Sequence, residues 1–84
     1  MITELKPIYT SQNSFYNKAI IELQSDILTL YSYNVRICKI ANGKFYRFFD
    51  GYTTTTMRHI NEFRMQNGLQ KLSKKEWLKM EVEA

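Results

Sequence analysis

A two-residue turn signal at Asn42-Gly43 constrains this sequence more than any other feature. Asparagine and glycine both tolerate positive φ, which the type I′ turn of a tight β-hairpin requires. The flanking segments are rich in β-branched and aromatic residues, VRICKIA before the turn and KFYRFF after it. The sequence therefore predicts a hairpin in which Cys38 pairs with Arg47.

The register of this hairpin assigns its side chains to two faces, and neither face is wholly polar. One face carries Val35, Ile37, Lys39, Ala41, Lys44, Tyr46 and Phe48, and the other carries Arg36, Cys38, Ile40, Phe45, Arg47 and Phe49. The second face would set Arg36 and Arg47 beside aromatic rings. Charged and aromatic side chains together indicate a binding surface.

Residues 15–33 fit two different structures. A helix over residues 16–31 would align one apolar stripe: Tyr16, Ile20, Leu23, Ile27 and Leu30. A hairpin turning at Ser25-Asp26 would instead place Leu23 opposite Leu28 and continue directly into the next strand pair. Because the segment is rich in isoleucine, threonine and tyrosine, we predict strands here, with the helix as the alternative.

Two helices are predicted after the turn at Asp50-Gly51. Threonine is a good N-cap residue and a poor helix-interior residue, so the first helix should begin near Thr55. Gly68 would end it in the left-handed conformation. Ser73 and Glu76 have the spacing of a capping box, which predicts a short second helix.

These elements make one α+β domain over residues 1–84. Residues 1–14 form a loosely attached lead-in, residues 15–52 a four-stranded antiparallel meander of two hairpins, and residues 53–84 two helices packed on one face. One cysteine excludes an internal disulfide. No apolar run is long enough to span a bilayer, and the first residues do not resemble a signal peptide, so we expect a cytoplasmic protein without membrane partners.

The chain resembles a family of small uncharacterised proteins that are common in phages and mobile elements of Firmicutes. The resemblance rests on SFYNKA, LYSYN, NGKFYRFFDGYTTTTMRHINEF and NGLQKLSKKEW, and covers about residues 14–77. In that family the middle segment typically reads DGYSATTMRHINEF. The resemblance implies a mobile-element context, supports strands over residues 17–33, and carries over no catalytic residue.

The sequence offers little for catalysis. His59 with Cys38 or Asp50 is the only nucleophilic arrangement available. A structural role suits the pair better, because Cys38 alternates with Arg36 and Ile40 as a small core residue would, and His59 lies one turn into a helix. One cysteine and one histidine are too few for a zinc site, and three glycines form no phosphate loop. We therefore predict no catalytic residue, no metal and no cofactor, with a small basic ribonuclease toxin as the third-ranked function.

Binding is the better-supported class. Residues 34–75 contain nine lysines or arginines and only two acidic residues. The candidate binding residues are Arg36, Lys39, Tyr46, Arg47, Phe49, Arg58 and Arg64. We expect a stoichiometric binding module whose partner is a host or phage protein, such as a nucleic-acid-bound nuclease of a defence system, which the module would inhibit in the manner of an anti-CRISPR protein. Direct binding or regulation of nucleic acid through the basic-aromatic face is the alternative.

Overall fold

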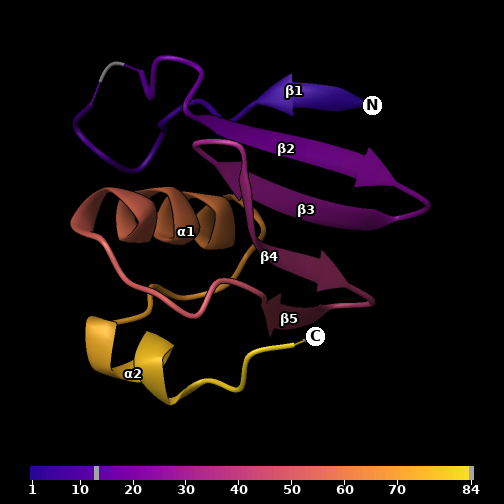
Figure 1. The fold of residues 1–84 in the computed structure, drawn as a ribbon. Helices are drawn as coiled ribbons and strands as arrows, with labels where there is room; N and C mark the ends of the chain where they lie inside the picture. The colour runs from indigo at the N-terminus through magenta and orange to yellow at the C-terminus, as the bar shows by residue number, and fades with distance from the viewer. Residues whose placement is uncertain (13, 84) are drawn as a thin grey trace.

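Figure 1 shows two layers in the computed structural model, an antiparallel sheet and two helices. The structure describes residues 1–12 and 14–83. The strands follow one another in the sheet in sequence order. The elements are β1 (Ile2–Glu4), β2 (Ala19–Gln24), β3 (Ile27–Ser32), β4 (Val35–Ala41), β5 (Lys44–Arg47), α1 (Thr54–Gln66) and α2 (Lys74–Lys79). The predicted α+β class is therefore confirmed.

Three turns connect β2, β3, β4 and β5 in sequence order. Each turn contains two residues with positive φ, as type I′ hairpins require. They lie at Ser25-Asp26 (φ 50° and 66°), Tyr33-Asn34 (51° and 67°) and Asn42-Gly43 (54° and 76°). Leu23 lies opposite Leu28, and Cys38 opposite Arg47. The first hairpin is thus confirmed with its register, and the second is confirmed between its turn and the Cys38–Arg47 pair. The predicted pairs beyond it, Ile37 with Phe48 and Arg36 with Phe49, are absent because β5 ends at Arg47, and the helix over residues 16–31 is wrong. The turn at Tyr33-Asn34 was not predicted.

The sheet has five strands instead of the predicted four, because residues 2–4 form β1 at its edge. The Leu23 N–H donates to the Met1 carbonyl, and the Leu5 N–H donates to the Ala19 carbonyl. These bonds extend the pairing of β1 with β2 on both sides. A three-residue strand is too short to show an alternating pattern, which is why the sequence indicated only a lead-in here.

The segment after β1 is held against α1 by the buried side chain of Glu62. One carboxylate oxygen accepts hydrogen bonds from the backbone N–H groups of Tyr9 and Thr10, at 3.0 and 3.1 Å. The Gln66 amide joins the same carboxylate to the Lys6 carbonyl. The prediction of a loose lead-in over residues 1–14 is therefore wrong for its described part; Asn13 lies outside the described residues.

A β-bulge in β4 decides which side chains share a face. Arg36 and Cys38 pair with consecutive residues of β3, so Ile37 between them is an extra residue. Ile37 and Cys38 are consequently both buried, although they are neighbours in a strand. Arg36 then lies on the opposite face from Cys38 and Arg47. The prediction that Arg36 and Arg47 share one face is wrong for this reason.

Both helices begin where the sequence signals place them. The Thr53 hydroxyl accepts the Thr56 N–H, so α1 begins at Thr54, one residue before the expected start. Ser73 and Glu76 form the predicted capping box of α2. The indole of Trp77 is fully buried and donates to the Gly51 carbonyl at 2.9 Å. No helix within the described residues is long and apolar enough to cross a membrane.

Candidate functional site on the open sheet face

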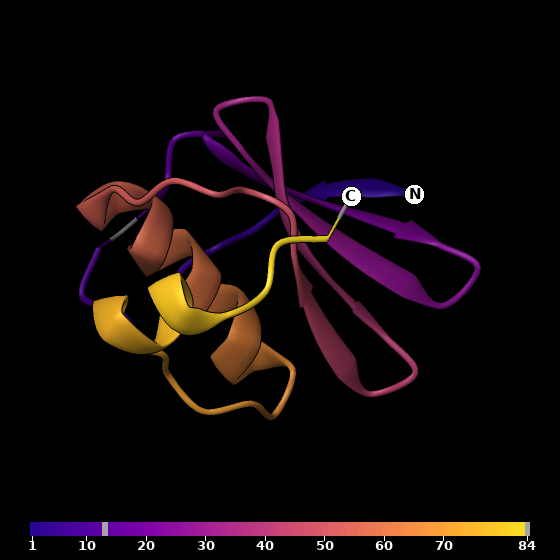
Figure 2. The same ribbon diagram turned by 60° about the horizontal axis from the view of Figure 1, so that its bottom comes forward.

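The sheet has one face that neither helix covers. Figure 2 shows both helices on the same side of the strands, with the hairpin tips extending beyond them. We call the opposite side the open face. Six side chains on it form the candidate site: Glu22, Tyr31, Arg36, Lys39, Tyr46 and Phe48.

Cations on the open face lie over aromatic rings. The guanidinium carbon of Arg36 lies 4.0 Å from the centre of the Phe48 ring. The Lys39 ammonium lies 5.1 Å from the Tyr46 ring and 5.6 Å from Phe48. These cation–π contacts hold two flexible cationic side chains in place, which lowers the entropy that a partner must remove on binding.

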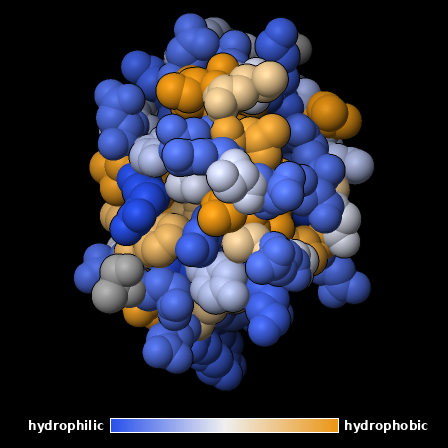
Figure 3. All heavy atoms as spheres, turned by 90° about the vertical axis from the view of Figure 1, so that its right-hand side faces the viewer, coloured by the Kyte–Doolittle hydropathy of each residue, from blue (hydrophilic) through white to orange (hydrophobic). Residues whose placement is uncertain are grey.

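An acid and a phenol complete the site. The Tyr31 hydroxyl donates to a Glu22 carboxylate oxygen at 3.3 Å. Partial burial and the nearby Glu22 charge raise the pKa of Tyr31, so it stays a neutral hydrogen-bond donor. Together with Thr29 and the cations, they line a hollow of about 450 Å³. Figure 3 shows apolar and hydrophilic side chains interleaved on the side of the molecule that carries the hairpin tips.

Arg47 lies on the covered face, where it joins β5 to α2. Its Nε donates to the Phe49 carbonyl at 2.8 Å, and its Nη1 donates to the Trp77 and Met80 carbonyls, both at 2.9 Å. The guanidinium carbon also lies 4.5 Å from the Trp77 ring centre. With only 3% of its surface exposed, Arg47 is positioned to hold the fold together.

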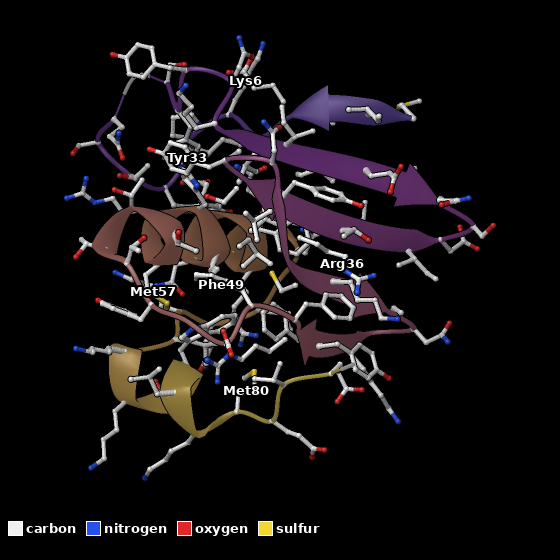
Figure 4. The ribbon with its side chains drawn as sticks, viewed as in Figure 1. Lys6, Tyr33, Arg36, Phe49, Met57 and Met80 are labelled. Atoms are coloured by element: carbon white, nitrogen blue, oxygen red, sulfur yellow. The ribbon has the colours of Figure 1, made fainter. Side chains whose placement is uncertain are left out.

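The other predicted arginines and Phe49 lie outside the open face. Arg64 is buried over the Phe45 ring, its Nε donates to the Gln70 carbonyl at 2.7 Å, and burial lowers its pKa. Arg58 is exposed on α1. Phe49 packs against the core, and Figure 4 shows it near α1 while Arg36 lies away from that helix. Of the predicted residues, the structure therefore brings together Arg36, Lys39 and Tyr46.

The site also contains residues that sequence reasoning missed. Phe48 was assigned to the same face as Lys39 and Tyr46, and that alternation could have identified it. Glu22 and Tyr31 joined the site because their strands are neighbours of β4, which requires the sheet order. No signal within a single strand indicates that contact.

Of the three residues considered for a nucleophilic arrangement, Cys38 and His59 are buried, whereas Asp50 is exposed. Cys38 has no exposed surface, and burial raises the pKa of its thiol, which disfavours the reactive thiolate. His59 Nδ1 lies 2.8 Å from the Ser32 hydroxyl oxygen, and its ring packs on Phe15. This arrangement ties α1 to β3.

Burial of His59 predicts that the protein loses stability in mild acid. Burial lowers the pKa of His59 to about 4, against about 6.5 in an unfolded chain. The unfolded state therefore binds more protons between these values, so the free energy of unfolding should fall by roughly 3 kcal/mol as the pH drops from about 7 to about 4. Urea unfolding at a series of pH values measures this.

A matched variant distinguishes the contribution of His59 to the pH dependence of stability from that of the carboxylates. His59→Asn cannot titrate, so most of the pH dependence above about pH 4.5 should disappear. The backbone N–H and hydroxyl of Ser73 lower the pKa of Glu76, so the stability contributed by Glu76 is lost only in stronger acid. An unchanged slope in His59→Asn would contradict this assignment.

Residues 3–79 match a family of unknown function, DUF8033. No curated protein and no solved structure matches the chain. The matched range includes both layers and nearly all of the open face. The predicted likeness to an uncharacterised family is confirmed, while the phage and Firmicutes context stays a prediction.

Proposed function

We propose that this protein, which belongs to the family of unknown function DUF8033, is a non-enzymatic module that binds a protein partner on its open face. The observation that carries the proposal is the pair of cations held over aromatic rings, Arg36 on Phe48 and Lys39 on Tyr46. Arginine and aromatic side chains contribute most of the binding energy at protein interfaces, because they are large and bury well.

Direct nucleic-acid binding is the alternative, and three observations disfavour it. Single-stranded nucleic acid binds by stacking bases on exposed rings, whereas Arg36 and Lys39 already lie over Phe48 and Tyr46. The Glu22 carboxylate lines the same hollow and would repel phosphate. Arg47 and Arg64, two of the predicted cations, donate to backbone carbonyls inside the fold.

The biological role that we propose is inhibition of a host nuclease or another defence machine by stoichiometric binding in the cytoplasm. This role is supported by the resemblance to phage and mobile-element proteins, and by the buried positions of Cys38 and His59, which suit binding better than chemistry. If the protein that binds the open face is identified and has no part in defence, that result would contradict the proposed role.

Titration of labelled oligonucleotides tests the choice between the two partner classes. We expect single-stranded and duplex DNA and RNA to bind with Kd weaker than about 10 µM at about 150 mM salt. Phosphate contacts by Arg36, Lys39 and Lys44 would instead give tighter binding that weakens about 40-fold between about 50 and 200 mM salt, because each contact releases counterions. That second result, abolished in Arg36→Gln/Lys39→Gln, would overturn the proposal.

A further inference from the structure

We infer that the open face recognises an acidic segment of its partner, in which one apolar side chain precedes or follows a carboxylate by about three residues. This inference rests on the proposed function and specifies the chemistry of the partner. It follows from two adjacent hollows on the open face that differ in character.

The first hollow is apolar and lies at the β1–β3 side of the sheet. It measures about 370 Å³ and is lined by Ile2, Ile20, Glu22, Tyr31 and Asn34. Ile2 is 69% exposed although it lies in a strand. When another apolar group covers exposed apolar side chains around a hollow, apolar surface is removed from water, which lowers the free energy. A leucine-sized or isoleucine-sized side chain suits this position.

The second hollow carries the cations and extends from β2 across β3 to β4. Arg36 and Lys39 line it together with Thr29 and Phe48. A guanidinium whose flat side lies over a ring keeps the N–H groups at its edge for other partners, and those groups match a carboxylate in a bidentate geometry. This hollow therefore suits an aspartate or glutamate side chain.

Glu22 and Tyr31 border both hollows, so the two hollows adjoin. Strands β2 and β4 flank β3, and two strand spacings amount to roughly 10 Å. An extended peptide covers that distance in about three residues. Glu22 lies in β2, at the end of this path beside the apolar hollow, where its charge repels acids, which places the partner's carboxylate at the other end, over β4. One or two carboxylates fit this charge pattern better than a polyanion, because the Glu22 charge offsets part of the positive charge.

Peptide titration of the isotope-labelled full chain tests the inference. The first peptide has about twelve residues, mostly glycine and serine, with one leucine and two glutamates placed about three residues after it. In one control peptide lysines replace the glutamates, and in the other serine replaces the leucine. Amide chemical shifts report both the affinity and the position of binding.

We expect the leucine–glutamate peptide to shift amides of β2, β3 and β4, with a Kd about tenfold or more below that of either control. The variant Arg36→Gln/Lys39→Gln should weaken it about tenfold or more while retaining native amide dispersion. Equal binding of the lysine peptide, shifts centred on α1 near Arg58, or tighter binding of oligothymidylate at the same amides would each overturn the inference. If the peptide experiment fails but a protein partner still cross-links to the open face, the inference about an acidic segment is wrong and the proposed function remains.

Discussion

Arg47→Ala should lower the free energy of unfolding by about 3–5 kcal/mol. The variant removes the three hydrogen bonds that the Arg47 guanidinium donates to the carbonyls of Phe49, Trp77 and Met80. The Trp77 carbonyl still accepts the Met80 N–H, whereas the partly buried Phe49 and Met80 carbonyls lose the guanidinium, at about 1–3 kcal/mol for each group left without a donor. The Trp77 ring also loses the cation that lies on it. Since a domain of this size is stable by roughly 4–13 kcal/mol, this loss would remove between about a quarter and all of the stability.

Arg36→Ala is the matched control, because it removes the same side chain from a neighbouring strand on the open face. We expect it to change stability by no more than about 0.5 kcal/mol. Arg47→Lys keeps the charge but lacks the forked geometry, so its stability should lie between those of the wild type and Arg47→Ala. Urea unfolding followed by Trp77 fluorescence measures all three. Equal stability of Arg36→Ala and Arg47→Ala would show that Arg47 does not hold α2 to the sheet.

Much of the fold could be predicted because its signals are local. Asn42-Gly43 specifies its turn through backbone preference alone, and the turn then determines the pairing of β4 with β5. The capping box of Ser73 and Glu76 likewise depends on residues three positions apart. Such features need no knowledge of the tertiary structure.

The candidate site was less predictable, because it depends on contacts between distant segments. The bulge at Ile37 separates Arg36 from Arg47, and nothing in the local sequence marks an extra residue there. Arg47 is buried because α2, which follows about thirty residues later, supplies carbonyls for its guanidinium. Glu62 similarly gains its partners from the segment after β1, more than fifty residues away. An arginine or glutamate whose partners are so distant has the same sequence signature as an exposed one.

Photo-cross-linking from the open face should capture a protein. Thr29 lies on this face within the hollow that Arg36 and Lys39 line, and benzoylphenylalanine at this position would face the partner. The same residue at Arg58, which is exposed on α1, is the control for non-specific capture. In extracts of the cells in which this protein occurs, we expect a protease-sensitive adduct of defined mass from position 29 and none from position 58.

Arg36→Glu/Lys39→Glu tests whether the cations hold that partner. Truncating a single interface hot spot costs about 2–4 kcal/mol, and a reversed charge adds repulsion, so affinity should fall by about 100-fold or more. Both side chains lie at the surface of the fold, and we therefore expect the thermal unfolding midpoint to change little.

The yield of the position-29 adduct in the wild-type and charge-reversed backgrounds decides whether the open face binds a protein. We predict a protein adduct that is resistant to nucleases and falls below about one tenth of its yield in the folded, charge-reversed variant. An adduct that nuclease removes, or one whose yield is unchanged by the reversal, would contradict binding of a protein by Arg36 and Lys39.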